Sequence, residues 1–387
     1  MSIYLDSKIS ISRSIETILR IPQARSTLMN TPVIERIDFL QWNFPPEFLM
    51  RYQPGVIFKK SWTVRFTDTE VLFFGTRSFS TPHLSPAQIA ATKSLVAGST
   101  FTELAKILTG TEIAEMIAYL DQNNLIRPIY HNEFVGTAWE KQVEYFTDFV
   151  DDPNAAQRRL LAASVCIVGC GGGGNIAVQH LVAAGVQRFT LIDGDQVELS
   201  NFNRQFCFDN SGIGQSKVEG LKNYILARNP NAIIHTFCQR IDSSDDLATL
   251  LNKNNLQPDL VLCCADTPPV AIQIFILEYC IKYQAICTFA GVGIHHGHFG
   301  PLLLDIGRMV QCLAHKQQQL KMISALESLD VGTGVISGSI SYLNTTVISL
   351  AIADAIELLA GIGSPPSLNR VLRYDALTKS TTVAQEY

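Results

Sequence analysis

A glycine-rich turn between an apolar strand and a helix is the part of this sequence most suited to chemistry. Gly169, Gly171 and Gly174 have the spacing G-x-G-x-x-G, after an expected strand over residues 162–168 and before an expected helix beginning at Asn175. The first two glycines allow a tight turn and close approach of backbone N–H groups to phosphate, and the third lets helix and strand pack closely. The turn therefore predicts a nucleotide site.

Charged residues after this turn indicate which nucleotide it binds. Asp193 ends the next expected strand, where a carboxylate can accept hydrogen bonds from ribose hydroxyls. Arg204 and Lys217 follow; a nicotinamide cofactor has no need of them, whereas ATP cleavage needs cations to offset charge on the phosphoryl oxygens. Asp266 comes directly after another expected strand, where a carboxylate is suited to hold Mg²⁺ between phosphates.

Each of these charged residues also has a purely structural interpretation. Arg204 could form a surface ion pair, Lys217 could be a solvated helix residue, and Asp266 could cap the helix that follows Pro268 and Pro269. Their joint occurrence, in this order and on this pattern of strands and helices, favours an ATP site.

The elements that must position these residues alternate between strand and helix. This alternation predicts an α/β domain with a mainly parallel sheet and crossover helices. The expected strands are residues 162–168, 188–193, 259–264 and 285–290, and the expected helices are residues 175–184, 217–228, 269–282 and about 335–359.

The segment from Gly169 to Glu219, with Asp266 after it, resembles the Rossmann-like adenylation domain shared by ubiquitin-activating (E1) enzymes and the bacterial ThiF/MoeB-type enzymes that activate sulfur-carrier proteins. The resemblance covers about residues 155–380 and includes three later segments: Phe299-Gly300-Pro301, Val331-Gly332-Thr333-Gly334 and Arg373-Tyr374-Asp375-Ala376.

The resemblance implies an enzyme that activates a carboxylate as an acyl-adenylate and releases pyrophosphate, usually as a homodimer. ATP and Mg²⁺ would be the cofactors, with Asp266 as the Mg²⁺ ligand and Arg204 and Lys217 as the catalytic cations at the phosphates. The other residues that we assign to the nucleotide on this basis are Gly169, Gly171, Gly174, Asp193 (to the ribose), Asp195, Asn201 and Gln205.

Two features depart from the family pattern. Bacterial members usually bind a structural zinc through two Cys-x-x-Cys pairs, but here Cys312 and His315 occupy the place of the first pair and no cysteine follows. Half the ligands of a tetrahedral site are missing, so we expect no structural zinc. The family's arginine motif before the first strand also has no match at residues 141–145, and Arg158 and Arg159 are the nearest arginines.

One cysteine and three histidines remain as open candidates. Cys312 lies near the place where some relatives have a thioester-forming nucleophile, although an inert remnant of the zinc pair is the favoured interpretation. His295, His296 and His298 surround a glycine on one expected strand, with the last two on one face. We rank them as substrate contacts or proton shuttles above metal ligands.

The residues before the adenylation domain form a second zone. Residues 55–75 have the pattern of short strands around a polar turn, and three short amphipathic helices follow up to Asn123. This winged-helix-like arrangement resembles the peptide-clamp domain that binds leader peptides in ribosomal peptide biosynthesis. We therefore divide the chain into a clamp domain (1–135), a linker (136–155) and an adenylation domain (156–387).

Composition excludes several classes of protein. The 387 residues are 47% hydrophobic and 17% charged, which excludes a disordered chain. A net charge of −5 argues against a nucleic-acid partner, and no apolar run is long enough for a membrane span without Asp354 or Glu357 interrupting it. Nine scattered cysteines indicate reduced thiols in a cytoplasmic setting.

The sequence thus predicts adenylation of a carboxylate on a ribosomal precursor peptide, leading to its modification or cyclisation. The class that this resembles is the E1-like enzymes of the microcin C7 and pantocin A type, and the missing zinc cysteines favour the pantocin type. Activation of a ubiquitin-like sulfur carrier is the alternative within the class, and an NAD(P)-dependent oxidoreductase is the alternative outside it.

Overall fold

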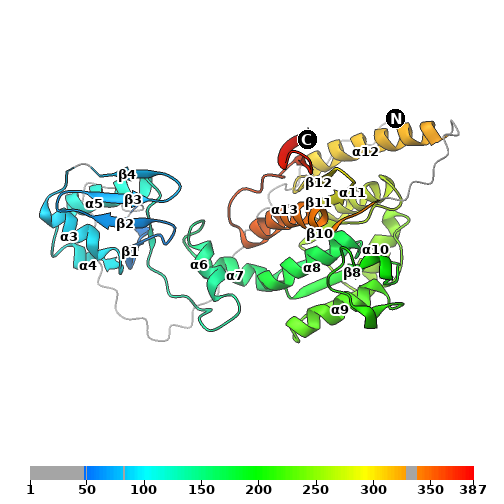
Figure 1. The fold of residues 1–387 in the computed structure, drawn as a ribbon, viewed down its shortest axis with the longest axis horizontal. Coiled ribbons are helices and arrows are strands. Elements are labelled where there is room, and N and C mark those ends of the chain that lie inside the picture. Colours follow the sequence, from blue (N-terminus) through cyan, green and yellow to red (C-terminus); the bar gives the residue numbers. More distant parts are fainter. Residues whose placement is uncertain (1–47, 49, 82, 328–337) are drawn as a thin grey trace, which may run out of the picture. The chain divides into compact units, whose positions relative to one another are not determined.

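The computed structural model describes residue 48 and residues 50–81, 83–327 and 338–387 (Figure 1). These residues form two compact units that divide between Ile129 and Tyr130. The glycine-rich segment 331–334 lies outside the described residues.

The described part of the first unit is built from two small sheets and the helices α3 to α5. Strands β2 (Thr63–Phe66), β3 (Val71–Phe74) and β4 (Ser78–Ser80) form an antiparallel sheet in the order β2-β3-β4, and β1 (Gly55–Phe58) lies between β5 (Ser99–Thr100) and β6 (Ile126–Pro128) in the other. The helices are α3 (Pro86–Ser94), α4 (Phe101–Leu104) and α5 (Gly110–Gln122).

Local sequence explains where these three helices begin. Each starts with a capping box: the Ser or Thr side chain at the N-cap accepts a backbone N–H, and a Gln or Glu three residues later accepts the N-cap N–H. The pairs are Ser85 with Gln88, Thr100 with Glu103, and Thr109 with Glu112. The predicted hairpin and helices are present, but α4 is a single turn, and Gly110 begins α5 instead of ending α4.

The second unit is built on an eight-stranded sheet in the order β14-β13-β12-β11-β10-β7-β8-β9. The five strands from β11 to β9 are parallel and the other three are antiparallel, which confirms the predicted mainly parallel α/β fold. Their bounds are β7 (Ser164–Val168), β8 (Arg188–Ile192), β9 (Ile233–Phe237), β10 (Leu260–Cys263), β11 (Cys287–Val292), β12 (His296–Phe299), β13 (Arg370–Asp375) and β14 (Ser380–Glu386).

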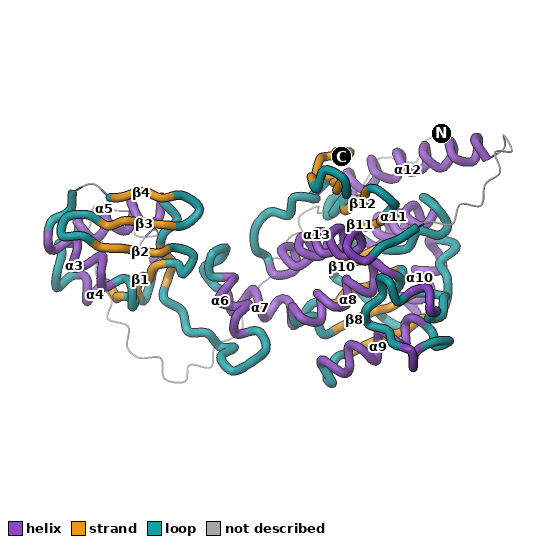
Figure 2. Tube along the Cα trace, in the orientation of Figure 1, coloured by secondary structure: helices purple, strands orange, loops and turns teal. Residues whose placement is uncertain are grey.

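Helices cover both faces of this sheet (Figure 2). One face packs against α8 (Gly172–Ala184), α9 (Lys217–Arg228) and α13 (Ser341–Ala360), and the other against α10 (Ser244–Lys253), α11 (Ala271–Tyr283) and α12 (Ile306–Glu327). Helices α6 (Glu140–Phe146) and α7 (Pro153–Ala162) pack on the C-terminal end of α13, and short 3-10 turns lie at Leu199–Asn201 and Asn210–Gly212.

The strand order creates a switch point between β7 and β10. From β7 the chain moves outward through β8 to β9, then returns to the other side of β7 to form β10 and β11. In such sheets ligands bind at the carboxyl ends of the strands where the order reverses. The glycine turn follows β7 and Asp266 follows β10, so both lie at this switch point.

Some predicted bounds were wrong. Ala162 ends α7 and is not the start of a strand, and the helix expected from Asn175 begins at Gly172 because the glycine turn enters the helix early. Helix α13 begins at Ser341 and not near Val335, since Ile340 before it has an extended backbone.

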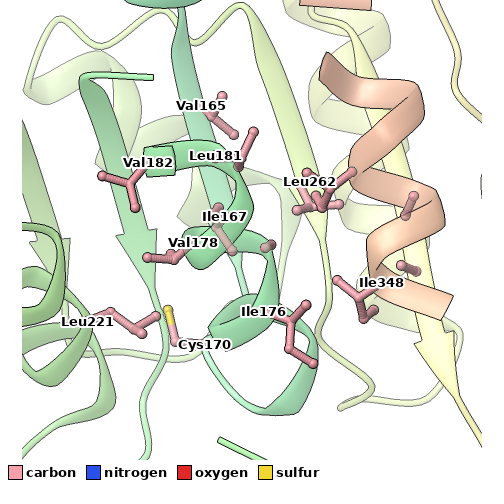
Figure 3. Close-up of a cluster of buried hydrophobic side chains, with 14 of the residues drawn as sticks. Val165, Ile167, Cys170, Ile176, Val178, Leu181, Val182, Leu221, Leu262 and Ile348 are labelled. Carbon is pink, nitrogen blue, oxygen red and sulfur yellow. The ribbon is translucent and has the colours of Figure 1, made fainter. Parts of the chain in front are cut away.

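Apolar side chains from β7, α8 and α13 form the core beneath the glycine turn (Figure 3). Val165 and Ile167 alternate along β7 toward α8, as expected for a strand buried on both faces. Ile348 of α13 and Leu262 of β10 close the cluster on the other side of α8. This packing gives the turn a rigid base.

Helix α13 is long and apolar enough by composition to cross a membrane, with a mean hydropathy of 1.5 over its best window. Half of that window is buried, and Asp354 on the helix is itself buried and accepts the backbone N–H of Ser367 at 2.9 Å. These contacts are those of a core helix against the sheet.

The third glycine of the turn provides a test of the fold. A Cβ at Gly174 would lie 2.1 Å from the Gly169 carbonyl oxygen, so Gly174→Ala must push α8 away from β7. We expect a loss of about 1–3 kcal/mol and a Tm lower by roughly 3–8 °C in thermal unfolding. Gly212→Ala is the control, because nothing lies within 4 Å of a Cβ there. Equal Tm values for the two variants would contradict the packing role.

Candidate active site

The glycine turn places the N-terminus of α8 at the switch point. Gly169 has φ +94°, and a Cβ there would lie 2.5 Å from the Ala265 backbone nitrogen, so only glycine fits. At Gly171 the nearest atom to a Cβ would be the Gln205 Nε2 atom at 3.8 Å, which leaves open space beside the backbone. Gly171 is also the N-cap of α8 and provides no side-chain cap. The N–H groups of the first turn are therefore available to an anion.

Asp193 links the glycine turn to the end of β8. Its Oδ2 atom accepts the Cys170 backbone N–H at 2.6 Å, and its Oδ1 atom accepts the Asp195 N–H at 2.8 Å. Each carboxylate oxygen has a further lone pair, so these bonds orient the group without using its full capacity.

Asp195 holds two cations near the same sheet edge. Lys217, at the start of α9, donates from Nζ to Asp195 Oδ2 at 2.9 Å, and only 10% of its side chain is exposed. Arg240, three residues after β9, donates to the other oxygen at 3.3 Å. The hydrogen bond from Lys217 lowers the pKa of Asp195, so this carboxyl stays ionised. Lys217 is a buried, paired cation and not a solvated helix residue.

Arg204 differs from Lys217 because no carboxylate pairs with it among the described residues. Its Nη1 atom donates to the Ser200 carbonyl at 3.1 Å and to the Asn203 Oδ1 atom at 2.8 Å. Both acceptors are neutral, so the guanidinium keeps its charge for a ligand. The interpretation of Arg204 as a surface ion pair is wrong.

Asn201 supports the loop that carries Arg204 and Gln205. Its carbonyl accepts the N–H groups of both residues, at 3.1 and 3.0 Å, and its side chain accepts the Glu198 N–H at 3.0 Å. Gln205 is 1% exposed, and its Oε1 atom has no hydrogen-bond partner among the described atoms. A buried amide oxygen without a partner is costly, which indicates that a ligand or water supplies a donor here.

Asp266 is exposed at the end of β10, and its Oδ1 atom accepts the Thr267 hydroxyl at 3.2 Å. It does not cap α11, because the N-cap of α11 is Val270, without a side-chain cap. Val270 has φ +62° and ψ −42°, and the Ala271 N–H donates to the Pro269 carbonyl at 2.6 Å, which makes a γ-turn of the rare positive-φ type. A β-branched residue is strained there, and such strain is typical of functional sites.

These residues surround one cavity of about 580 Å³ at the carboxyl ends of β7, β8 and β10. Gly174 and Asn201 are buried behind its wall: Gly174 contacts the Gly169 carbonyl, and Asn201 holds the Arg204 loop. All the other residues that the sequence assigned to the nucleotide line it: Gly169, Gly171, Asp193, Asp195, Arg204, Gln205, Lys217 and Asp266.

Arg240 and Asn344 are among the polar residues of the cavity that the sequence analysis missed. Arg240 follows β9, and because this strand was not predicted, the position of Arg240 at the carboxyl edge of the sheet could not be inferred. Asn344 lies in the first turn of α13, with its Oδ1 atom 2.6 Å from where a Cβ of Gly172 would be. No local pattern in the sequence indicates this contact between distant segments.

The three histidines do not line the cavity. His296 and His298 share one face of β12, as predicted, with their ring centroids 5.0 Å apart, while the backbone carbonyl of His295 accepts the Ala376 N–H. Burial, followed by the neighbouring His296, Arg373 and Lys316, lowers the pKa of His298. A neutral His298 imidazole is the expected state at neutral pH.

Cys312 also lies outside the cavity lining, and so do Arg158 and Arg159, the two arginines considered for the family's arginine motif. Burial raises the pKa of the Cys312 thiol to about 11, so it is protonated at neutral pH, in keeping with an inert cysteine. Arg158 pairs with Glu133 and Asp152, and Arg159 donates to the Ala360 carbonyl at the end of α13. Within the described part of the chain, no group of three or more His, Cys, Asp or Glu side chains could hold a metal ion.

A Rossmann-like sheet whose switch point carries an uncapped helix N-terminus and flanking cations defines a nucleotide-binding domain of the E1-like kind. Residues 140–386 match the ThiF family, and the chain belongs to this family. The predicted resemblance is confirmed.

Curated relatives are adenylyltransferases. The molybdopterin-synthase adenylyltransferase of Escherichia coli is 32% identical over 222 residues, which cover 57% of this chain and 82% of the relative. The sulfur carrier protein adenylyltransferase of Thermus thermophilus is 31% identical over 230 residues, which cover 58% and 79%. The prediction of an adenylating enzyme is confirmed by this family membership.

Solved structures share the fold. Escherichia coli MccB with succinimide has a TM-score of 0.70 at 21% identity, over 86% of this chain and 96% of MccB. PaaA has a TM-score of 0.62 at 18% identity, over 85% of this chain and 99% of PaaA. At these identities the likeness concerns the fold alone.

The pair of Lys217 and Asp195 predicts how stability changes with pH. Because the pKa of Asp195 is lowered in the folded state, the pair stabilises the fold above the unfolded pKa near 3.8 and is lost as pH falls through the lower folded value. Lys217→Met should therefore have a lower Tm than wild type at pH 6, and this Tm difference should shrink as pH falls below 3.8. Since Asp195 is half exposed, we expect this change in the Tm difference to be only roughly 1–3 °C.

The measurement is a series of thermal melts between pH 3 and pH 6. Lys253→Met is the control, because this substitution removes the same charge from an exposed residue of α10 and leaves the pair of Lys217 and Asp195 intact. If the Tm difference between Lys217→Met and wild type is the same at every pH, this link between the pair and pH is refuted.

Proposed function

We propose that this chain uses ATP and Mg²⁺ to adenylate a carboxylate on a ribosomally made precursor peptide, as a step toward modification or cyclisation of that peptide. The observation that carries the proposal is the cavity at the switch point, where the uncapped first turn of α8 and the unpaired Arg204 face one space. Backbone N–H groups and a free guanidinium are what a polyphosphate requires.

Further features of the cavity fit a nucleotide. Gly171 leaves room for the phosphates to approach the backbone, and Asp193 is oriented by two backbone N–H groups with lone pairs left for ribose hydroxyls. The buried Oε1 atom of Gln205 lacks a donor that a bound ligand or its waters would provide. These features support the assignment of the eight lining residues to ATP.

The charged residues have separate roles in the proposed reaction. Attack of the substrate carboxylate on the α-phosphate transfers AMP to that carboxylate and releases pyrophosphate, and negative charge accumulates on the phosphoryl oxygens. Arg204 and Lys217 offset this charge, with Lys217 kept in place by Asp195. Asp266 is the carboxylate that would hold Mg²⁺, which when bound would supply further positive charge at the phosphates.

The peptide part of the proposal is supported by the solved neighbours. MccB, the microcin C7 biosynthetic enzyme, has been solved with ATP and with N-formylated MccA. The structural match covers 86% of this chain, whereas residues 130–387 are only about two thirds of it, so the match extends into the first unit. A peptide-binding first unit is what separates such an enzyme from a sulfur-carrier activator.

Strand β4 offers the edge for this peptide. It is the last strand of the sheet β2-β3-β4, and it lies by α5, because Arg77 before it donates to Asn123 at 2.9 Å. On either side of β4, the Thr81 N–H donates to the Val71 carbonyl and the Gly75 N–H donates to the Arg77 carbonyl. The backbone groups of odd-numbered residues along this strand therefore point toward β3. The backbone groups of Ser78 and Ser80 therefore point outward, where an extended leader peptide can add a strand.

Activation of a ubiquitin-like sulfur carrier is the second candidate, and the identities of 31–32% to sulfur-carrier enzymes favour it. Pyrophosphate release with such a carrier, and none with a short peptide, would select it. A homodimer in the cytoplasm and the absence of a structural zinc stay predictions. A nicotinamide-dependent oxidoreductase is disfavoured by family membership.

Asp266→Asn tests the metal part of the proposal. We expect binding of ATP without metal to be unchanged, and the extra affinity given by Mg²⁺ to fall roughly ten- to hundredfold, since an ionic contact contributes about 1.5–3 kcal/mol. Calorimetric titration of ATP with Mg²⁺ or with EDTA measures both. Asp245→Asn, an exposed carboxylate of α10, is the control. If Asp266→Asn responds to Mg²⁺ as wild type does, the assignment of Asp266 to the metal is rejected. If the wild-type chain binds NAD instead of ATP, the assignment of the cavity to ATP is rejected.

Ser80→Pro tests the clamp. Proline removes an outward N–H while leaving the ladder between β3 and β4 intact, so we expect leader binding to weaken at least about tenfold while ATP binding is retained. The probe is a fluorescein-labelled candidate precursor peptide, to be sought as a short open reading frame next to the gene, and binding is followed by fluorescence anisotropy. Ser80→Ala should bind as wild type does. Unchanged affinity in Ser80→Pro, at an unchanged Tm, would rule out strand addition at β4.

A further inference from the structure

Asp195 is a carboxylate whose two oxygens each accept from a different cation. Its Oδ2 atom accepts from Lys217 Nζ at 2.9 Å, and its Oδ1 atom accepts from Arg240 Nη2 at 3.3 Å. All three side chains line the cavity, and because the carboxyl is ionised at neutral pH, they carry one net positive charge together. Lys217 has a place in the proposed reaction at the phosphates, whereas Arg240 has none.

Lys217 is anchored to Asp195 by its backbone as well as by its side chain. Its N–H donates to the Asp195 carbonyl at 3.0 Å, at the first position of α9, and only 10% of the side chain is exposed. These bonds fix the ammonium without help from Arg240. The same carboxylate offsets the charge of the ammonium that it holds, and an ammonium within a neutral pair attracts a phosphate weakly. The charge of Lys217, and not its location, therefore needs support from a third group.

Arg240 reaches Asp195 from the solvent side, with 67% of its side chain exposed. Its aliphatic part crosses the backbone of Gly194, because a Cβ at Gly194 would lie 2.9 Å from Arg240 Cγ and 3.1 Å from the Arg240 nitrogen. The segment after β9 thus packs closely on the turn after β8, and the guanidinium comes within reach of Asp195 Oδ1. Exposed ion pairs contribute little to stability, so a purely structural role does not explain this contact.

We propose that Arg240 is a positioning residue that keeps the charge of the Lys217 ammonium available to the phosphates of ATP. By occupying Oδ1, Arg240 offsets the charge of Asp195, so Asp195 still holds Lys217 but no longer cancels its charge. The inference rests on the proposed function, because it assigns a further residue to the same nucleotide site. An electrostatic role of this kind acts more strongly on a ligand with more phosphates.

The test is calorimetric titration of the full chain with ATP, AMP and adenosine, all in EDTA so that Asp266 takes no part. Arg240→Gln should weaken ATP binding roughly three- to tenfold, AMP binding less, and adenosine binding not at all, as for loss of one charge near a polyanion. Its Tm should stay within about 1 °C of wild type. Salt at about 1 M, where charges are screened within about 3 Å, should remove most of the difference in ATP affinity.

Three further variants separate charge from shape and direct from indirect action. Arg240→Lys keeps the charge and should recover most of the ATP affinity. Arg370→Gln is the matched control, because Arg370 forms an exposed ion pair with Glu386 at 3.4 Å outside the cavity lining, and it should bind all three ligands as wild type does. In a chain that carries Asp195→Asn, adding Arg240→Gln should change ATP affinity less than about twofold, because the group through which Arg240 acts is no longer charged.

Several outcomes would overturn this role of Arg240. They are an unchanged ATP affinity in Arg240→Gln, an equal loss for ATP, AMP and adenosine, no recovery in Arg240→Lys, and an equal loss in Arg370→Gln. A loss that persists in full beside Asp195→Asn would show direct contact of Arg240 with the ligand. If wild type binds ATP and Arg240→Gln matches it, only the role of Arg240 is wrong. If wild type binds none of the three ligands, the nucleotide site itself is wrong, and with it the proposed function.

Discussion

The close approach of two backbone segments is the constraint on which the site depends. The carbonyl of Gly169 lies where a Cβ of Gly174 would be, and the backbone of Ala265 lies where a Cβ of Gly169 would be. These contacts bring the turn after β7, the first turn of α8 and the end of β10 into one small space. Any side chain at either glycine would separate them, and the N–H groups of α8 would no longer face the residues after β10.

Charge is distributed unevenly around this space. Asp195 takes Lys217 and Arg240 as partners, whereas Arg204 bonds only to neutral oxygens. A paired cation is held in position but has part of its charge offset, and an unpaired cation keeps its charge but needs other contacts to position it. The loop bonds of Asn201 provide those contacts for Arg204. The arrangement therefore combines one fixed cation with one that is free to meet a ligand.

The sequence predicted the parts of the site that local rules govern. The glycine spacing and the strand ends placed Gly169, Asp193 and Asp266 correctly at one sheet edge, because parallel strands end on the same side. Arg240 and Asn344 were missed for a physical reason. Arg240 depends on β9, whose half-exposed residues have no clear alternation, and Asn344 depends on where α13 crosses the glycine turn, which is a tertiary contact.

A chain with net charge −5 leaves Arg204, at the cavity, without a carboxylate partner in its described part. Both ligands of an adenylation reaction are anions, and they repel each other as they meet. Cations at the phosphates alone would favour the nucleotide but would do nothing to retain the second anion. Under the proposed function, the first unit supplies that retention, because a leader peptide bound there gives the attached carboxylate a high effective concentration at the cavity.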